Sequence, residues 1–372
     1  MMQIKTIYFT GGGTLGMSFV GVIKALQEYN LLNNVETVIG TSIGSMIACS
    51  LTLNVPWKDL YKSFFDFNVT TCAHIEIDNI LTKFGLDSGK KFMISFVKML
   101  KKHAKKTNMT FKEHYELTKK KLIITAACVN DQTTHYFDYQ RTPNLQIIRA
   151  VRMSISLPFY FTSPKYNRKH MVDGGTFETY PFQLFGDSAT FLGIGLIRPG
   201  PTTFKPIKTI ENFISNIISG SRNRITKIEK LFCNKNNYKF IDIISDGPVL
   251  DFDNKTSLKI RLFQNGYDEA KKYIIEQIIN KKNDDNILLS QNDNRINSLE
   301  NKLDLIIKLL QNNSVKSLNN IELIENNITE PQNINIIESQ DNEPIKSIQK
   351  NIIQLQKTKS IEPVINSCKE KH

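Results

Sequence analysis

The stretch Val35-Glu36-Thr37-Val38-Ile39-Gly40-Thr41-Ser42-Ile43-Gly44-Ser45 contains the pattern that predicts the fold of this chain. Its short apolar run over 35–39 is typical of a strand, and the residues from Ser45 onward have helical spacing. Between them lies a G-x-S-x-G pattern, residues 40–44. At a sharp strand-to-helix turn the serine oxygen is exposed, and glycines on either side let the backbone pass without Cβ clashes. Ser42 is therefore a candidate nucleophile, and the alternative is a serine that only caps a helix.

Strands and helices alternate over the first 200 residues. Further strand-like runs occur at 4–9, 122–129 and 191–197, and residues 134–138 can pair beside the second of these as a hairpin. Apolar residues with helical spacing follow the first run, over 19–32. Such alternation with tight glycine turns predicts an α/β fold, in which helices cover a mostly parallel sheet.

A glycine loop, Gly11-Gly12-Gly13-Thr14-Leu15-Gly16, follows the first strand. It matches the dinucleotide-binding pattern G-x-G-x-x-G, but that pattern expects an acidic residue at the end of the next strand, where this chain has Gly40-Thr41-Ser42. A P-loop is excluded because Met17-Ser18 follows the loop in place of Lys-Ser/Thr. The better interpretation is an oxyanion hole that faces the serine. The amides expected to form it are those of Gly11, Gly12, Gly13 and Ile43.

A nucleophilic serine needs a base, and the usual histidine is missing. In α/β-hydrolases the histidine comes after the acidic residue, and here only His372, the last residue, follows the late acidic candidates. The alternative is an aspartate that accepts the proton directly. Asp173 is the candidate because Gly174-Gly175 follows it and a strand-like run, Lys169–Val172, precedes it. Taken alone, Asp-Gly-Gly would indicate a hairpin turn.

The composition narrows the class of protein. The chain has 372 residues, of which 40% are hydrophobic and 23% charged, and a formal net charge of +12. This charge favours an anionic partner, and the sequence shows no nucleic-acid-binding motif, so a membrane surface is the expected one. We expect an intracellular, cytoplasmic protein, because no 18-residue apolar run and no signal-peptide pattern is present. The five cysteines are far apart without a C-x-x-C pair, which argues against a metal site or a disulfide framework.

Composition also divides the chain. A catalytic-type domain is expected over 4–200 and a mainly helical extension over 201–280. Apolar residues with heptad spacing over 289–310 predict either a short coiled coil across 281–313, and hence a homo-oligomer, or a lone amphipathic helix packed on its own body. The polar composition of 314–372 predicts a disordered tail.

A dense basic stretch lies between residues 90 and 121. Its apolar residues fall on one face of a helix, and lysines lie elsewhere. A basic amphipathic helix can bind an anionic bilayer. The alternative is a surface helix whose apolar face covers the core. The lysines that could contact a membrane are Lys98, Lys101, Lys102 and Lys105.

The three motifs in this order resemble the patatin-like phospholipase family. Its pattern of a glycine loop, G-x-S-x-G and Asp-Gly-Gly/Ala is matched by Gly11–Gly16, Gly40–Gly44 and Asp173–Gly175, and residues 150–161 resemble the segment that leads to the aspartate. The resemblance implies a three-layer α/β/α domain. It also implies hydrolysis of lipid acyl esters by a Ser42–Asp173 dyad, through an acyl-enzyme and without a cofactor or metal.

One residue departs from the family pattern: Leu15 stands where the family commonly has Arg or Lys. Two alternatives to a hydrolase stay open, namely a non-catalytic lipid- or protein-binding module on an inactivated fold and an acyltransferase that uses the same dyad. The intact pair of Ser42 and Asp173 favours an enzyme. The glycines that the resemblance assigns to the motifs are Gly16, Gly40, Gly44, Gly174 and Gly175.

Overall fold

The computed structural model describes residues 3–68, 73–104, 106–197, 206–208, 210–245 and 255–325. The chain divides into two units, Met1–Leu288 and Leu289–His372. The first unit holds every strand that the structure describes, together with the helices up to α9. Helix α10 (Thr256–Glu325) begins in the first unit and ends in the second.

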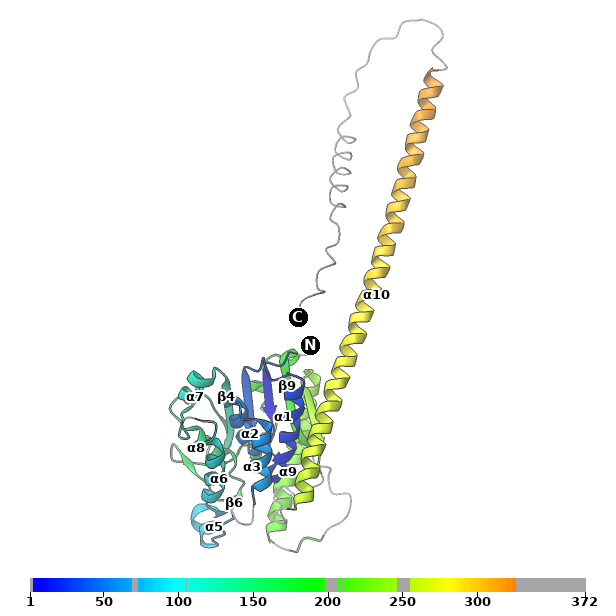
Figure 1. Cartoon of the computed structure of the whole chain (residues 1–372). Helices are drawn as coiled ribbons and strands as arrows, with labels where there is room; N and C mark the ends of the chain where they lie inside the picture. The colour runs from blue at the N-terminus through cyan, green and yellow to red at the C-terminus, as the bar shows by residue number, and fades with distance from the viewer. Residues whose placement is uncertain are drawn as a thin grey trace. The chain divides into compact units, whose positions relative to one another are not determined.

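An eight-stranded sheet forms the centre of the first unit (Figure 1), in the order β10-β9-β1-β2-β4-β8-β7 with β5 beside β4. The strands β10, β9, β1, β2 and β4 are parallel neighbours, whereas β5, β7 and β8 pair in antiparallel fashion. This arrangement confirms the predicted α/β fold with a mostly parallel sheet. Its strands are β1 (Thr6–Phe9), β2 (Thr37–Thr41), β4 (Lys121–Cys128), β5 (Thr133–Phe137), β7 (Lys165–Tyr166), β8 (Lys169–Asp173), β9 (Phe191–Ile197) and β10 (Lys239–Ile244).

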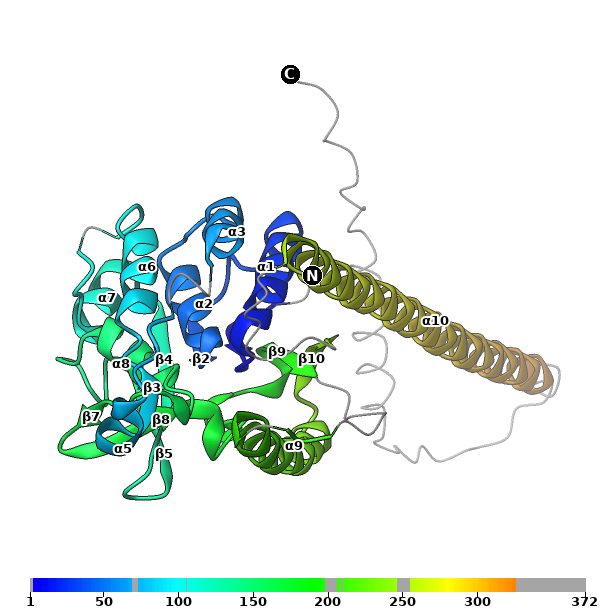
Figure 2. The ribbon, with the colours of Figure 1, turned by 90° about the horizontal axis from the view of Figure 1, so that it is seen from below.

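Helices cover both faces of this sheet (Figure 2). Helices α1 (Met17–Glu28), α2 (Ile43–Thr52) and α3 (Trp57–Asp66) lie on one face, and α9 (Ile210–Lys235) lies on the other. A strand that is covered on both faces is buried along its length and has a nearly continuous apolar sequence. Strand β2 is of this kind, because it is buried from Val38 to its end. The shorter elements are α5 (Asp78–Lys83), β3 (Gly85–Asp87), α6 (Lys90–Leu100), α7 (Phe111–Thr118), α8 (Ile147–Ser154) and β6 (Phe159–Phe161), with β3 and β6 paired as a small second sheet.

The first turns of α10 pack closely on α1. A Cβ atom on Gly21 would lie 2.0 Å from the carbonyl oxygen of Phe263, and one on Gly266 would lie 1.9 Å from that of Ser18. The two backbones therefore approach each other through glycines, where a side chain would force them apart. This contact belongs to the body, so the helix begins well before the expected boundary at residue 281.

The C-terminal part of the chain differs from the sequence-based expectation. Residues 314–325, which we expected to be disordered, are the end of helix α10, and residues 326–372 lie outside the described residues. The heptad side chains that the structure describes are exposed; they are Ile296, Leu299, Leu303 and Ile306. The heptad positions at 289 and 310 have side chains outside the described set.

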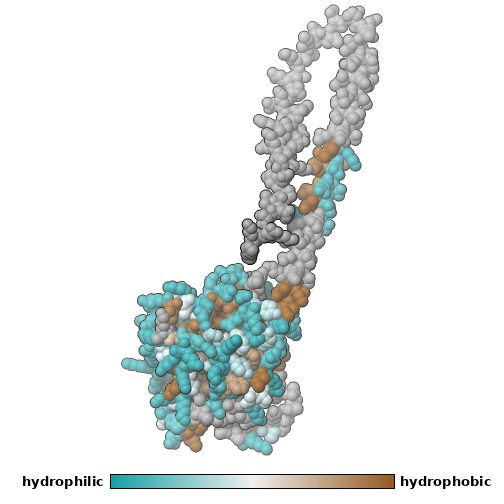
Figure 3. All heavy atoms as spheres, in the orientation of Figure 1, coloured by the Kyte–Doolittle hydropathy of each residue, from teal (hydrophilic) through white to brown (hydrophobic). Residues whose placement is uncertain are grey.

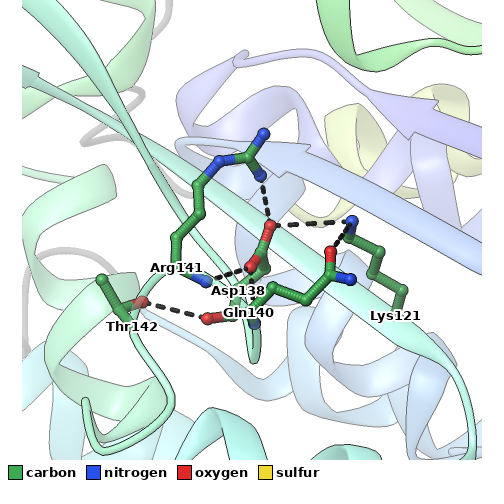
Figure 4. A network of polar contacts seen from close by, with 5 residues as sticks. All are labelled: Lys121, Asp138, Gln140, Arg141 and Thr142. Carbon is green, nitrogen blue, oxygen red and sulfur yellow. Dashed lines mark hydrogen bonds and ion pairs between the residues drawn. The ribbon is translucent and has the colours of Figure 1, made fainter.

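A polar network fixes the loop between β5 and α8 (Figure 4). The fully buried carboxylate of Asp138 accepts hydrogen bonds of 2.8 Å from the amides of Gln140 and Arg141, and a further one from the Arg141 guanidinium. Lys121 lies 3.8 Å from the same carboxylate and donates to the Gln140 side chain at 2.7 Å. These partners satisfy a charge whose burial would otherwise be costly. The network ties the loop that leads into α8 to the start of β4.

Candidate active site

Ser42 and Asp173 are brought together by two strands that end against β4. Strand β2 runs parallel to β4, and its last residue, Thr41, pairs with Thr125. Strand β8 runs antiparallel to β4, and its last residue, Asp173, pairs with Ala126. The two strands approach from opposite ends of β4 and stop at consecutive residues of it. The residue that follows Thr41 is therefore a neighbour of Asp173.

The backbone of Ser42 is strained at the turn between β2 and α2. Its φ of 56° and ψ of −129° are rarely adopted by residues other than glycine, and such a conformation costs about 1–3 kcal/mol. The surrounding structure holds it: the Ser42 amide donates to the Ser154 hydroxyl at 2.8 Å, and its carbonyl accepts from the Ser45 hydroxyl at 2.6 Å. The turn directs the Ser42 side chain, which is 8% exposed, toward a cavity.

The glycines of the G-x-S-x-G motif allow this turn to form. A Cβ atom on Gly40 would lie 2.3 Å from the carbonyl oxygen of Gly44, and one on Gly44 would lie 2.3 Å from that of Phe9 on β1. Neither position can carry a side chain without a shift of the backbone. Gly16 is restricted in a similar way, because its Cβ would lie 2.5 Å from the Ile43 side chain.

Asp173 is buried and is held by the turn that follows it, η2 (Gly174–Thr176). Its carboxylate accepts a hydrogen bond of 2.9 Å from the Gly175 amide, and its own amide donates to the Ser156 carbonyl at 2.8 Å. A Cβ atom on Gly174 would lie 2.3 Å from the Thr125 hydroxyl. The two glycines after Asp173 therefore let the turn pack directly on β4.

Burial raises the pKa of Asp173 above the usual range of an aspartate, because the low dielectric penalises the charged form. Three partners oppose this rise in the pKa: the charge of Arg222, a hydrogen bond from the Ser42 side chain and the Gly175 amide. A carboxylate with a raised pKa is a better proton acceptor than an exposed one. The arrangement is that of a hydroxyl beside a base.

The glycine loop lies against Ser42. A Cβ atom on Gly11 would lie 3.1 Å from the Ser42 Cβ, and Gly13 has a φ of 58°, which favours glycine. Gly13 lines the same cavity as Ser42. Ile43 is the first residue of α2, so its amide has no acceptor within that helix. Gly11 thus lies against the serine, Gly13 lines the same cavity, and Ile43 follows the serine in the chain.

Two other residues of the loop face the protein interior. A Cβ atom on Gly12 would lie 2.1 Å from the Leu196 side chain, so this position has no room for a larger residue. Leu15 is fully buried in the hydrophobic core. The side chain that departs from the family pattern therefore packs in the core.

An apolar cavity opens beside Ser42 and Asp173, with an open volume of about 140 Å³. Side chains from α2, α3, α6 and α10 contribute to its wall, and the apolar ones include Met46, Phe64, Phe92, Phe96, Leu157 and Leu262. Apolar cavities with a few polar groups at one end are typical of ligand sites. The serine and the carboxylate supply those polar groups here.

Arg222 on α9 is a site residue that the sequence analysis missed. A Cβ atom on Gly175 would lie 3.1 Å from a guanidinium nitrogen of Arg222 and 3.2 Å from the Asp173 carboxylate. Arg222 also lines the cavity. It comes from the 201–280 region, where no local motif points to chemistry. Only the tertiary packing of α9 brings it to the dyad.

The predicted basic helix is shorter than the basic stretch. Helix α6 ends at Leu100, and its residues Phe96, Met99 and Leu100 are buried in the core. This face covers the core, as one of the two interpretations expected. The lysines Lys98, Lys101 and Lys102 are exposed, and Lys105 lies outside the described residues.

Among the described residues, one group of side chains has the spacing of a metal site. Cys128, Asp131 and His135 lie at the β4–β5 turn with their ligand atoms within 4.8 Å of one another. Asp131 is already paired with Lys169 at 2.8 Å. Cys128 pairs with Met171 and Thr133, whereas Thr41 and Asp173 pair with Thr125 and Ala126 of the same strand. None of the three residues of this group lines the cavity beside Ser42.

The comparison with known sequences identifies the domain that holds this site. Residues 7–185 match the sequence profile described as patatin-like phospholipase. These residues resemble the patatin-like phospholipase family. The profile covers the glycine loop, Ser42 and Asp173, so the predicted resemblance is confirmed.

Relatives of the chain occur in large DNA viruses. An uncharacterised protein of Acanthamoeba polyphaga mimivirus is 28% identical over 290 residues, which are 74% of this chain and 95% of the mimivirus protein. A probable lipid hydrolase of Invertebrate iridescent virus 6 is 27% identical over 186 residues, which are 48% of this chain and 62% of that protein. The chain therefore spans less than two thirds of the iridescent-virus relative.

The fold resembles that of a solved bacterial structure. VipD from Legionella pneumophila superposes with a TM-score of 0.54 at 15% sequence identity, over 73% of this chain and 66% of that of VipD. At this identity the likeness shows the fold alone. In the part of the chain that the structure describes, no helix is both long enough and apolar enough to cross a membrane.

The raised pKa of Asp173 predicts a dependence of stability on pH. Below the ordinary aspartate pKa of about 3.9 the group is neutral in the folded and the unfolded protein. As the pH rises toward the folded pKa, the unfolded state ionises first, so the free energy of unfolding falls. We expect Asp173→Asn to raise Tm by a few degrees at neutral pH and to leave it unchanged at pH 3.

Thermal unfolding of both proteins across this pH range, followed by circular dichroism, measures the effect. A Tm that is lower for Asp173→Asn at neutral pH would show that the attraction to Arg222 outweighs burial.

Proposed function

We propose that this protein hydrolyses fatty acyl esters of lipids, with Ser42 as the nucleophile and Asp173 as the general base. One observation carries the proposal: a buried carboxylate with a raised pKa accepts a hydrogen bond from a serine on a strained turn, at the end of an apolar cavity. The patatin-like domain and the probable lipid hydrolase among the relatives support a lipid substrate.

The first step forms an acyl-enzyme. Asp173 takes the hydroxyl proton while Ser42 Oγ attacks the ester carbonyl carbon. The tetrahedral intermediate collapses, its carbon–oxygen bond to the leaving alcohol breaks, and Asp173 returns the proton to that alcohol. The amides assigned to the negative oxygen are those of Gly11, Gly12, Gly13 and Ile43.

The second step repeats the first with water as the nucleophile. Asp173 deprotonates water, which attacks the acyl carbon, and Ser42 leaves with the proton. An acyltransferase would use an alcohol in place of water and needs the same residues. The cavity wall is suited to the acyl chain, since burial of each CH₂ group contributes about 0.8 kcal/mol.

The non-catalytic alternative rests on Leu15, which leaves the glycine loop without a positive charge, and on the long C-terminal tail. Leu15 is a core residue here, and Arg222 places a guanidinium beside Asp173. The site therefore has a positive charge from another element. This observation favours an enzyme.

A fluorophosphonate probe, which reacts with activated serines, tests the dyad. We expect the wild-type protein to be labelled and Ser42→Ala to remain unlabelled, because the nucleophile is gone. Asp173→Asn should lose labelling by roughly two or more orders of magnitude, since a positioned base contributes about 10²–10⁴-fold. Labelling of Ser42→Ala at the wild-type rate would sink the assignment, and Ser50→Ala, on the same helix but outside the cavity wall, serves as the matched control.

We further propose that an anionic membrane surface binds beside the cavity. Apolar side chains are exposed on α5 and its flanks, where Figure 3 shows brown atoms at the lower end of the body. The most exposed are Leu81 at 84% and Ile77 at 75%. Phe84, which precedes β3, and Phe159, the first residue of β6, are exposed and have positive φ. Exposed aromatic side chains on a strained backbone are suited to insertion into lipid.

Two of the exposed apolar residues are neighbours in the chain of residues that line the cavity. Phe159 precedes Tyr160 and Phe161, which line the cavity, and Ile94, which is 57% exposed, stands between the lining residues Phe92 and Ser95. The exposed lysines of α6 and the turn after it add positive charge. A lipid could pass from the bilayer to Ser42 without crossing water.

Vesicle co-sedimentation tests the membrane surface. We expect Ile77→Asp/Leu81→Asp to reduce binding to vesicles of phosphatidylcholine and phosphatidylserine at least tenfold, because two apolar anchors are lost and two negative charges are added. The matched control is Leu117→Asp on α7, a site that is 48% exposed and outside the cavity wall. Equal loss for both proteins, or binding indifferent to phosphatidylserine and salt, would contradict the proposal.

The heptad face of α10 is proposed to pair with a second copy of this chain. Its exposed apolar positions, such as Leu299 and Leu303, repeat with the heptad spacing of a coiled coil, which places them on one side of the helix where a second helix can pack.

Sedimentation velocity of the intact protein tests this pairing and should show a dimer that Leu299→Lys/Leu303→Lys converts to a monomer. Leu305→Lys, at an exposed position outside the heptad, should not change the mass. A monomeric wild type at high concentration would exclude this pairing.

A further inference from the structure

Arg222 brings a positive charge to the active site from outside the three motifs. A Cβ atom on Gly11 would lie 3.1 Å from the Ser42 Cβ and 3.4 Å from a guanidinium nitrogen of Arg222. On the other side, the guanidinium lies against Gly175 beside the Asp173 carboxylate. Arg222 therefore lies beside both glycine segments that flank the dyad, and the missing Cβ atom of Gly175 leaves room for its guanidinium.

The helix that carries Arg222 is anchored to the segment after Asp173. Glu229 accepts hydrogen bonds of 2.9 and 3.0 Å from the amides of Thr179 and Tyr180, and the Thr226 hydroxyl donates to that of Thr179 at 3.0 Å. Positions 222, 226 and 229 lie on one face of α9 at helical spacing. Helix α9 covers the sheet face opposite α1 and α2 (Figure 2). These bonds hold Arg222 over the turn η2.

Other charged residues of the cavity wall, among those that the structure describes, are engaged elsewhere. Asp87 accepts hydrogen bonds of 2.7 Å from the amides of His74 and Gly89. Lys259 donates to the carbonyls of Phe65 and Phe67 at 2.7 and 2.6 Å. Arg222 is only partly buried and has five N–H donors, more than a single neighbouring carboxylate can accept. Its guanidinium is the cationic group beside Ser42.

We propose that Arg222 binds the phosphate of a glycerophospholipid while Ser42 attacks the acyl ester. The proposal rests on the proposed function and makes it narrower: the substrate is a phospholipid rather than a neutral acylglycerol. In a glycerophospholipid the phosphate and the sn-2 ester stand on adjacent glycerol carbons, so a cation near the serine meets the phosphate. The planar guanidinium matches phosphate oxygens with two parallel hydrogen bonds.

A pair of substrates with the same acyl chains tests this assignment. Dioleoylphosphatidylcholine and dioleoylglycerol are compared in the same detergent micelles, with wild type, Arg222→Gln and Arg222→Lys. We expect Arg222→Gln to lower the ratio of kcat/KM for the phospholipid over the diacylglycerol by roughly 10- to 100-fold, because hydrogen bonds to charged groups contribute about 1.5–3 kcal/mol. Arg222→Lys should restore part of the ratio. Arg224→Gln, exposed on the same helix, should leave both rates unchanged.

The alternative role of Arg222 is electrostatic support of Asp173 or of the oxyanion. In that case Arg222→Gln lowers kcat/KM on both lipids by the same factor, and the unchanged ratio overturns phosphate recognition. A wild type that cleaves neither lipid would contradict the proposed function. In that case the binding measurement below tests phosphate recognition by Arg222 without any turnover.

The binding measurement uses the Ser42→Ala protein and ether-linked dioleoyl phosphatidylcholine, which cannot be hydrolysed. We expect Arg222→Gln in this background to weaken binding of the ether phospholipid at least tenfold and to weaken binding of the ether diacylglycerol far less. Inorganic phosphate is added as a competitor in a parallel titration. Equal weakening for both ether lipids, or inorganic phosphate that binds as tightly as the phospholipid, would overturn recognition of a lipid head group.

Discussion

The candidate active site depends on one constraint of the sheet: two strands of opposite direction stop at consecutive residues of β4. Thr41 ends β2 opposite Thr125, and Asp173 ends β8 opposite Ala126. Backbone hydrogen bonds set this register, and a slip of one residue would turn the side chains to the other face. The distance between serine and carboxylate is therefore set by the ladder of β4 rather than by flexible loops.

This register is maintained against two local costs. Ser42 is held in a strained conformation, and Asp173 is held in a buried place where its charge is penalised. The hydroxyl of Ser154 accepts from the Ser42 amide, and the amide of Gly175 donates to Asp173. The network around the buried Asp138 fixes the loop that leads into α8, the helix that ends at Ser154. Under the proposed function, stability is lost at the residues that react, a common relation between stability and function.

Charge and apolar surface are distributed over different elements around this centre. The guanidinium comes from α9 on one face of the sheet, whereas α2, α3 and α6 on the other contribute to the apolar cavity. Further apolar residues are exposed on α5 and its flanks, where we propose that a membrane surface binds. A phospholipid is divided in the same way, because its phosphate lies on one side of the ester bond and its apolar acyl chain on the other.

The sequence alone determined the α/β class, the resemblance to the patatin-like family and the positions of the three motifs, because strand–glycine–helix patterns are local and their glycines are required by close backbone contacts. It also indicated a change of composition toward the C-terminus, but helix α10 begins before that change and continues to Glu325. Only the tertiary structure decided that Leu15 is a core residue and that Arg222 and Ser154 meet the dyad. These positions result from packing between elements far apart in the chain, and packing of that kind leaves no periodic or spacing signal in the sequence.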